Sequence, residues 1–323
     1  MSAIEVYATC GGTSVTTWLI TGANGNLGRR LITTLLEDPN TRVRAVVRSQ
    51  SAAAILSDLP LADITDDAQA RLHVTVLSYT DEAALTQAAR SCDVAVHLVG
   101  ILKESSTSTY VDAHEHSGDA FVGACKAAGV GHIVYLSIVG ATAGSTNACL
   151  ASKGRAEQRL RAFGKTTVLR VPMVLGEGDY ASRALYYRAI KPRSFTFRAA
   201  SKEQPVYAGD VVRAIVRAAE LGIDDSIDLG GPEILSREAL TQRAAASLNR
   251  HTRVVSLPVG LGMAIGWIME KTSANPALTR AMLGVLDHDD DVDSEPAMRT
   301  LGLDQLTSLD EMLRCVFAPQ TVS

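Results

Sequence analysis

The sequence has few cysteines, few aromatic residues and almost no excess of charge of one sign. Its 323 residues include five cysteines, which lie far apart and form no Cys-x-x-Cys pair. This pattern disfavours a disulfide framework or a cysteine zinc site, so we expect no metal and a reducing compartment. Lys and Arg number 31 against 35 Asp and Glu, giving a net charge of −4. Such a balance gives no electrostatic reason to expect a nucleic-acid partner.

The sequence also lacks a basic targeting segment and an apolar run long enough to cross a membrane. No Lys or Arg precedes Arg29, so neither a secretory signal nor an organelle presequence is indicated, and a cytoplasmic location is expected. The run Leu257–Met269 has thirteen residues, which is too few for a bilayer. We interpret it as a buried helix of a C-terminal lobe, with a peripheral membrane contact as the alternative.

Short apolar runs rich in β-branched residues alternate with helical stretches through the first half of the chain. Their length suits strands that are buried on both faces, as a parallel sheet requires. Right-handed crossovers between them predict an α/β fold with a doubly wound parallel sheet, the Rossmann arrangement. The expected strands are Val15–Ile20, Val43–Val47, Leu72–Leu77, Val94–Val99, His132–Leu136 and Thr167–Val171, and the expected helices include Leu27–Leu36, Asp81–Arg90 and Val111–Ala128.

This alternation ends after about Val171, which predicts a second, smaller unit. We assign residues 14–178 to a dinucleotide-binding domain and residues 179–323 to a smaller, mixed C-terminal substrate lobe. Within the second part, the stretch near residues 205–231 is expected to pack back on the core. Helices are expected over Arg183–Ile190 and Gly209–Leu221, and a third helix is expected after Ser236, which can cap it.

The most specific motif is the glycine-rich segment Thr21–Gly28, TGANGNLG, between an apolar strand and a helix. Gly22 permits a tight turn, Gly25 lets the backbone approach a pyrophosphate, and Gly28 lets the helix lie close to the strand. An ordinary glycine-rich turn is the alternative, but the strand–turn–helix context favours dinucleotide binding. The residues of this turn that we expect at the cofactor are Gly22, Asn24, Gly25, Asn26, Leu27 and Gly28.

The residue at the end of the second expected strand indicates which dinucleotide binds. An Asp or Glu at this point would contact the ribose 2′-hydroxyl of NAD, but Arg48 and Ser49 stand there instead. A guanidinium suits a 2′-phosphate through forked, charged hydrogen bonds. We therefore expect NADP(H) to be preferred and NAD(H) to be possible. A solvated arginine without a role is the alternative.

An ordered series of short motifs extends from about Trp18 to Leu313. After TGANGNLG they are His97–Ile101, His114–Gly129, Val134–Ser137, Leu169–Pro172, Gln204–Tyr207 with Asp210–Val211, and Leu229–Glu233. With these motifs the chain resembles the extended, atypical short-chain dehydrogenases. Among them it is most similar to the group related to the nucleotide-binding accessory subunit of respiratory complex I.

The resemblance implies roles for individual residues. Ser137 would be the active-site serine, and Lys153 would be the lysine of the family's Tyr-x-x-x-Lys pair, which also holds the cofactor. The implied cofactor residues are Leu98, Val99 and Gly100 at the ribose, Ser78 at the adenine, and Val171, Pro172 and Met173 along the nicotinamide. The implied substrate pocket comprises Ile101, His114, Ile138 and Tyr207.

The sequence departs from the family at two positions. Ser78 stands where the family usually has an aspartate, which should loosen adenine recognition. Cys149 stands four residues before Lys153, where the family has the tyrosine that exchanges a proton with the substrate. Three interpretations follow: catalysis with another acid such as Ser137, loss of catalysis with retention of the cofactor, or a reactive Cys149 thiolate beside the lysine cation. Cys149 can also be inert packing.

Together these features predict an NADP(H)-binding oxidoreductase that acts on an unidentified small or apolar substrate. The alternative is a cofactor-binding structural, assembly or regulatory protein without turnover. Ser137 and Lys153 favour the enzyme, and Cys149 favours the alternative.

Overall fold

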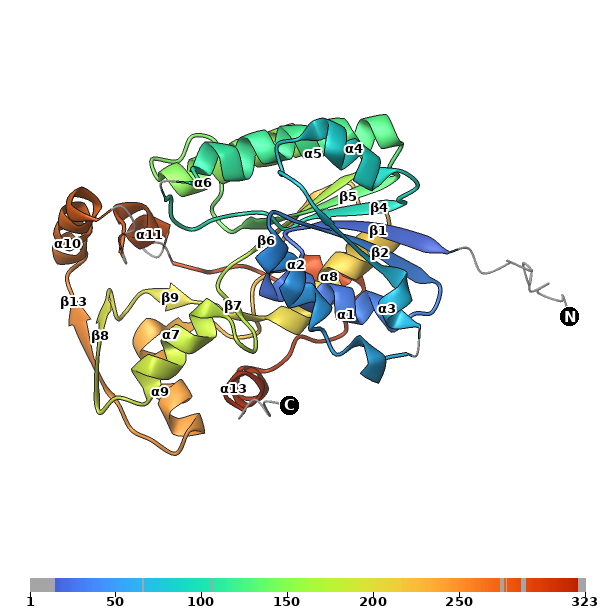
Figure 1. Ribbon diagram of the computed structural model, residues 1–323. Helices are drawn as coiled ribbons and strands as arrows, with labels where there is room; N and C mark the ends of the chain where they lie inside the picture. The colour runs from blue at the N-terminus through green and yellow to red at the C-terminus, as the bar shows by residue number, and fades with distance from the viewer. Residues whose placement is uncertain are drawn as a thin grey trace, which may run out of the picture.

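The computed structural model describes residues 15–65, 67–105, 107–273, 276, 278–285 and 289–318. Its centre is a seven-stranded sheet in the order β11-β6-β5-β4-β1-β2-β3, with every pairing parallel (Figure 1). The strand order reverses between β1 and β4, so the predicted doubly wound fold is confirmed. The strands are β1 (Thr16–Thr21), β2 (Thr41–Val47), β3 (Leu72–Val76), β4 (Val94–His97), β5 (His132–Ile138), β6 (Thr166–Val171) and β11 (Ser226–Asp228).

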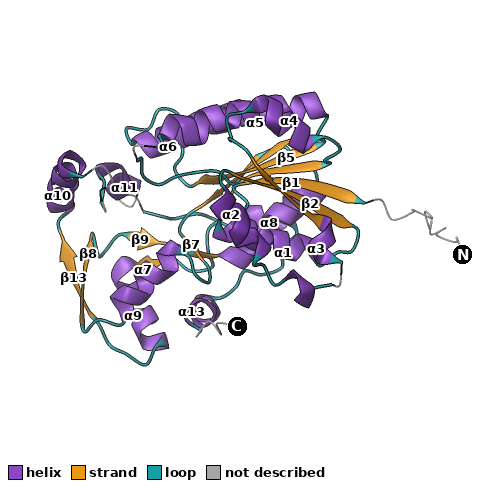
Figure 2. Ribbon diagram, in the orientation of Figure 1, coloured by secondary structure: helices purple, strands orange, loops and turns teal. Residues whose placement is uncertain are grey.

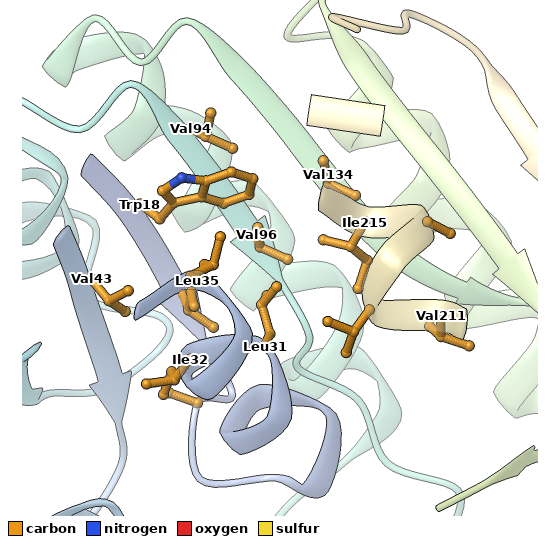
Figure 3. Close-up of a cluster of buried hydrophobic side chains, with 14 of the residues drawn as sticks. Trp18, Leu31, Ile32, Leu35, Val43, Val94, Val96, Val134, Val211 and Ile215 are labelled. Atoms are coloured by element: carbon orange, nitrogen blue, oxygen red, sulfur yellow. The ribbon is translucent and has the colours of Figure 1, made fainter. Parts of the chain in front are cut away.

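Helices cover both faces of this sheet. One face carries α1 (Asn26–Leu36), α2 (Gln50–Ser57), α3 (Ala68–Arg71) and α8 (Ala208–Glu220), against which α12 (Glu295–Leu301) also packs. Figure 3 shows Leu31 of α1 and Ile215 of α8 meeting Val96 and Val134 of the sheet. The other face carries α4 (Glu82–Ala89), α5 (Ser117–Ala128) and α6 (Ala148–Arg161). Because helices cover both faces of the sheet, the strands are continuous apolar runs in the sequence.

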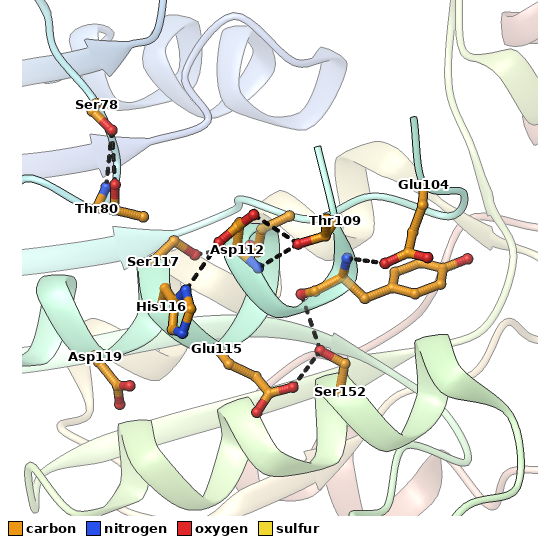
Figure 4. A network of polar contacts seen from close by, with 12 residues as sticks. Ser78, Thr80, Glu104, Thr109, Asp112, Glu115, His116, Ser117, Asp119 and Ser152 are labelled. Carbon is orange, nitrogen blue, oxygen red and sulfur yellow. Dashed lines mark hydrogen bonds and ion pairs between the residues drawn. The ribbon is translucent and has the colours of Figure 1, made fainter. Parts of the chain in front are cut away.

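The helix expected over Val111–Ala128 is two elements. Its first part, η2 (Val111–His116), is a π-helical turn, and α5 begins at Ser117. Contacts with α6 hold this turn. The Glu115 carboxylate accepts a hydrogen bond from the Ser152 hydroxyl (3.0 Å), as Figure 4 shows. Glu115 also forms an ion pair with Arg155 (2.8 Å). These partners lie about forty residues away in the chain, so the periodicity of the turn could not reveal them.

Beyond the sheet lies a smaller unit with its own apolar core. Leu185 of α7 (Tyr180–Ala189), Leu240 of α9 (Arg237–Ser247) and Met312 of α13 (Leu309–Phe317) belong to that core. The Ser236 hydroxyl caps α9 by accepting a hydrogen bond from the Ala239 amide (3.0 Å). Three two-stranded sheets complete the unit (Figure 2): β7 (Val174–Leu175) with β10 (Val206–Tyr207), β8 (Arg193–Phe197) with β13 (Arg253–Leu257), and β9 (Lys202–Glu203) with β12 (Leu235–Ser236).

The apolar run near the C-terminus forms a helix, α10 (Val259–Thr272), followed by α11 (Arg280–Val285). The expectation of a buried helix is wrong, because Leu261, Trp267 and Ile268 are 48%, 50% and 52% exposed. The buried residues of α10 are Gly262 and Gly266, one turn apart on the same face. A Cβ at Gly262 would lie 2.8 Å from the Phe197 ring, so the glycines permit the close approach and the bulky residues face outward. None of the helices in the described ranges combines the length and apolar character needed to cross a bilayer.

Candidate active site

The glycine-rich turn joins β1 to α1 at the carboxyl edge of the sheet. Gly22 has a φ of +74°, a conformation that favours glycine, and accepts a hydrogen bond from the Gly25 amide (3.0 Å). A Cβ at Gly28 would lie 2.6 Å from the Ala23 carbonyl oxygen, so α1 packs directly on the turn. Gly25 is exposed, and no side chain caps the amides of the first turn of α1. These open amides and the helix dipole suit a pyrophosphate.

Tyr79, just after β3, holds the glycine-rich turn in place through a hydrogen bond. The sequence analysis did not predict this role. Its buried hydroxyl accepts a hydrogen bond from the Gly22 amide (3.1 Å) and donates to the Val46 carbonyl (3.3 Å). The guanidinium of Arg48 lies 5.6 Å from the Tyr79 ring centroid. A tyrosine directly after the third strand is the signal in the sequence, but its partners come from the two neighbouring strands.

The two residues expected at the adenosine end are both exposed. Arg48 makes no ion pair or hydrogen bond with another described residue, and its position above Tyr79 leaves the guanidinium open to a ligand. Ser78 shares a hydrogen bond with the Thr80 hydroxyl (2.9 Å) and accepts one from the Thr80 amide (3.3 Å) (Figure 4). The Ser78 hydroxyl is therefore engaged by Thr80 within the same turn.

A cavity of about 590 Å³ lies between the carboxyl edge of the sheet and the smaller unit. Most of its wall is apolar. Many of the expected cofactor, catalytic and substrate-pocket residues line it: Leu27, Leu98, Ser137, Ile138, Lys153, Val171, Pro172 and Met173. Expected site residues of α1, β5 and α6 thus converge with those that follow β4 and β6. Four other expected residues, Ile101, His114, Cys149 and Tyr207, do not line the cavity.

Lys153 of α6 is a buried amine at the wall of this cavity. Its Nζ donates a hydrogen bond to the Leu136 carbonyl (2.9 Å) and lies 4.8 Å from the centroid of the Tyr135 ring. Burial lowers the pKa of Lys153 from its usual 10.5 to about 8, because charged ammonium loses solvation there. A group that titrates near neutral pH can release and regain a proton during turnover.

Ser137, the penultimate residue of β5, has a hydroxyl whose proton is already engaged in a hydrogen bond. The hydroxyl donates to Glu157 Oε1 of α6 (2.5 Å), and Arg170 of β6 holds both oxygens of the same carboxylate. Ser137 and Glu157 are buried. Because the carboxylate takes its hydrogen, Ser137 faces the cavity as a hydrogen-bond acceptor. The sequence did not reveal this chain of contacts, since its three members come from different elements.

Cys149 lies behind Lys153, away from the cavity. Its Sγ lies 3.6 Å from the Ile101 carbonyl oxygen, and burial raises the pKa of the thiol from 9.0 to about 11. Burial thus has a larger effect on this pKa than the nearby Lys153 cation, which disfavours the thiolate interpretation. A neutral, enclosed thiol is what packing alone would produce.

His114 and Ile101 lie beside Cys149. The Ile101 amide donates to Nε2 of His114 (3.1 Å), and burial lowers the pKa of this histidine to about 3. His114 is therefore neutral and acts as an acceptor here. His116, two residues on, is exposed and bonded to Asp112 (2.9 Å) (Figure 4). No group of three potential metal-binding side chains occurs among the described residues.

Tyr207, expected on the substrate side, lies at the start of α8 instead. Its hydroxyl donates to Glu177 Oε1 (2.7 Å), and the Arg30 guanidinium lies 5.3 Å from its ring centroid. Glu177 also pairs with Arg30, and its carbonyl accepts from Asn26 (2.9 Å). Tyr207 thus ties the end of the glycine-rich turn to the smaller unit, and these contacts hold it away from the cavity.

The fold and the open glycine-rich turn define a dinucleotide-binding protein of the Rossmann type. A family model described as NAD(P)H-binding matches residues 22–213, more than half of the chain, and the chain belongs to this family. The match contains the turn and the cavity residues of β4, β5 and α6. The cofactor is therefore a nicotinamide dinucleotide, and the protein is of the NAD(P)-binding oxidoreductase type.

Two curated proteins show which branch of this family is similar. Ceramide reductase from Caulobacter vibrioides is 27% identical over 173 residues, which cover 53% of this chain and 50% of that protein. The mitochondrial NADH dehydrogenase [ubiquinone] 1 alpha subcomplex subunit 9 of Mus musculus is 26% identical over 145 residues, 43% of this chain and 38% of that one. The matches span half or less of each relative. They confirm the resemblance to the atypical short-chain dehydrogenases.

Solved structures confirm the fold. UDP-glucuronic acid 4-epimerase from Bacillus cereus, in complex with UDP-glucuronic acid and NAD, superposes with a TM-score of 0.71 at 17% identity. The superposition covers 93% of this chain and 98% of that one. MoeE5 in complex with UDP-glucose and NAD gives a TM-score of 0.67 at 18% identity over 93% of this chain and 97% of the other.

Proposed function

We propose that the protein is a carbonyl reductase that uses NADPH and acts on a largely apolar substrate. The observation that carries this proposal is that Ser137 and Lys153 line one apolar cavity together with Pro172 and Met173. These are the residues expected at the nicotinamide and at the reacting oxygen. The cavity is thus apolar except for a small number of polar groups, as is usual at ligand sites.

In this proposal the cofactor, when bound, supplies a hydride to the substrate carbonyl carbon. The open amides of the glycine-rich turn hold the pyrophosphate, and Leu98 and Lys153 hold the nicotinamide end. Lys153 replaces the family's tyrosine as the acid: its ammonium gives a proton to the carbonyl oxygen and recovers one from water. The pKa of about 8 supports this role, because an acid works best when its pKa lies near the working pH.

We assign the preference for NADPH to Arg48. It stands at the end of β2 with an exposed guanidinium and makes no ion pair with another described residue. A forked contact to a 2′-phosphate is worth about 1.5–3 kcal/mol, or about ten- to a hundred-fold in affinity. In fluorescence titrations, Arg48→Ala should weaken NADPH binding by that factor and leave NADH unchanged. Equal loss for both cofactors would refute the assignment.

The apolar substrate is supported by the cavity lining and by one relative. Leu136, Val174, Phe197 and Leu240 contribute to the wall, so the hydroxyl groups of a sugar would find few partners along this part of the cavity. A relative whose name describes reduction of a ceramide agrees with this chemistry. The expected substrates are long-chain aldehydes or ketones.

The test is oxidation of NADPH, followed at 340 nm by absorbance, with aldehydes and ketones of increasing chain length. Turnover should rise with chain length and fall by about 10²–10⁴-fold in Lys153→Met, the usual contribution of an acid. Lys126→Met, an exposed lysine of α5, is the matched control and should behave as wild type. Equal rates in wild type and Lys153→Met would exclude Lys153 as the acid.

A second candidate function, cofactor binding without turnover, is favoured by the site's departures from the family. Cys149 replaces the tyrosine, and the Ser137 proton is bound to Glu157. A relative that is a subunit of an NADH dehydrogenase complex is consistent with a structural role. Tight NADPH binding with no turnover of any compound in the panel would favour this function.

We also propose that α10 contacts the surface of a lipid bilayer. Its exposed face carries Leu261, Trp267 and Ile268, and Val259 of the same helix lines the cavity together with Met282 of α11. The helix that carries the exposed apolar residues therefore also contributes to the wall of the cavity, and an apolar substrate concentrates in lipid. A helix with this composition can lie in the interface without spanning it.

Sedimentation with phosphatidylcholine vesicles tests the contact. The wild type should bind, and the double substitution Trp267→Ser with Ile268→Ser should reduce binding at least tenfold. Ile234→Ser removes an equally exposed apolar residue outside α10 and should change nothing. Vesicle binding that survives the double substitution would place the contact elsewhere.

A further inference from the structure

Charged side chains gather at the end of the cavity away from the glycine-rich turn. They are Arg188 of α7, Glu203 of β9, Arg237 of α9 and Asp290, in a lining that is otherwise mostly apolar. Glu203 and Arg237 bind each other, with Nε 2.5 Å from Oε1, and Arg237 Nη1 also donates to the Phe197 carbonyl (2.5 Å). Asp290 also interacts with another residue of the protein. These three groups are therefore satisfied within the protein.

Arg188 differs from its neighbours. Its Nε is buried and has no hydrogen-bond partner, and the side chain forms no ion pair with any residue that the structure describes. A guanidinium keeps its charge in proteins and has five donors. A charged group left unpaired in a mostly apolar wall is costly, and a ligand that accepts its hydrogen bonds removes that cost.

The geometry of α7 places Arg188 at a defined distance from the glycine-rich turn. Tyr180, Ala184 and Arg188 line the cavity at intervals of four residues, so one face of the helix forms the wall. Asp179, just before α7, interacts with Asn26 of the glycine-rich turn. At 1.5 Å per residue, Arg188 lies about 12 Å along the helix from Tyr180.

We propose that Arg188 binds an oxyanion, a carboxylate or a phosphate, carried at one end of an otherwise apolar substrate. The guanidinium fork matches both groups through two parallel hydrogen bonds. The reacting carbonyl then lies at the opposite end of the cavity, near Ser137 and Lys153. That orientation depends on the proposed reductase function, whereas binding of the oxyanion does not.

The other charges around Arg188 limit the charge of the ligand. Glu203 and Asp290 are acidic, and burial raises the pKa of Glu203 despite its contact with Arg237. Among the described residues, none that lines this end is a lysine, and Arg237 is already engaged by Glu203. A singly charged oxyanion therefore fits better than a group that carries two charges.

The test compares three probes with the same chain at concentrations below micelle formation: dodecanoate, dodecyl phosphate and dodecanol. Binding is measured calorimetrically on the full chain at pH 7, with NADPH present. The wild type should bind at least one of the two anions about ten- to a hundred-fold more tightly than the alcohol. The two anionic probes distinguish a carboxylate site from a phosphate site.

Three variants test whether Arg188 causes the preference for an anion over the alcohol. Arg188→Met should lose it and still bind dodecanol, and Arg188→Lys should keep a reduced preference because a single ammonium cannot form the fork. Arg183→Met, on the exposed side of the same helix, is the matched control and should behave as wild type. NADPH affinity reports whether each variant is folded.

The proposal is overturned if the wild type shows no preference for either anion, or if Arg188→Met retains it. If Arg188→Met does not fold, Arg188→Lys decides the question, because an unchanged preference there excludes the fork. Loss of reductase activity alone does not affect this result. An anion preference in a protein without turnover would leave the oxyanion site in place and contradict the reductase.

Discussion

At the scale of single residues, two of the three residues expected to take part in catalysis lie at the cavity. Lys153 and Ser137 line the cavity, but Cys149 is enclosed behind them against Ile101. The glycine-rich turn and the Lys153 position followed from the sequence, because both belong to local motifs. Tyr79 and Arg188 did not, because their roles depend on partners or walls supplied by distant segments.

The first prediction concerns the pH dependence of carbonyl reduction. If the protonated form of Lys153 is the acid, kcat/KM should be constant below about pH 8, where the ammonium is present. Above that pH it should fall about tenfold per unit as the pKa is passed. The measurement is initial rate against pH with an aldehyde that does not ionise. A profile that is flat to pH 10 would contradict the role.

The second prediction concerns Cys149. Because its thiol is neutral and does not line the cavity, Cys149→Ala should change kcat/KM less than about threefold. The loss of a small buried side chain should lower the free energy of unfolding by about 1 kcal/mol. Urea unfolding and steady-state kinetics on the same preparations check both parts. A hundredfold loss of activity at unchanged cofactor affinity would show that the thiol takes part in catalysis.

At the scale of elements, the strands and most helices were predictable and two features were not. The six strands expected from apolar runs all form, because a sheet covered on both faces demands such runs. The π-helical turn η2 was not predicted, since Ser152 and Arg155 of α6 hold it through Glu115. The exposure of α10 was not predicted either, because an apolar composition does not show whether another element covers the helix.

The third prediction compares two glycines of the turn before α1. A Cβ at Gly25 would lie 3.2 Å from the Gly22 carbonyl oxygen, in exposed space, whereas one at Gly28 would lie 2.6 Å from the Ala23 carbonyl oxygen. Gly25→Val should therefore cost less than about 1 kcal/mol of stability and abolish NADPH binding. Gly28→Val should cost about 1–3 kcal/mol or more, because α1 must move from the turn.

Thermal unfolding and NADPH titration of both variants test this comparison. The informative result is the separation between them: Gly25→Val folded without cofactor affinity, and Gly28→Val destabilised. If Gly25→Val still binds NADPH as the wild type does, the pyrophosphate does not lie on this turn.

At the scale of the whole molecule, the cavity exists because the sheet and the smaller unit meet at the carboxyl edge. Ser137 and Lys153 come from the first part of the chain, and Arg188 and Arg237 from the second. From the segment 205–231, β11 joins the sheet and α8 packs against it, so the chain returns to the core before completing the smaller unit. The sequence indicated both parts, but their mutual contact is tertiary and has no local pattern.

The last prediction concerns acid stability, which depends on a histidine in the centre of the fold. His97 of β4 is fully buried between Thr21 (2.7 Å) and Ser117 (3.3 Å). Burial lowers its pKa from 6.5 to about 3. Between these values the unfolded chain binds a proton that the folded protein does not. The free energy of unfolding therefore falls as the pH falls, by up to about 1.4 kcal/mol per unit.

Urea unfolding of the cofactor-free protein between pH 7 and pH 4 measures this slope. His97→Gln keeps a polar side chain but cannot titrate, so its stability should depend less steeply on pH than that of the wild type below about pH 6.5. The control is His73→Gln, at an exposed position of β3, which should keep the wild-type slope. The variant should be less stable than the wild type at pH 7, and its stability should approach or exceed that of the wild type near pH 4. This direction of change with pH distinguishes the effect from a lost ion pair. Parallel curves at all pH values would show that His97 is protonated in the folded protein as readily as in the unfolded chain.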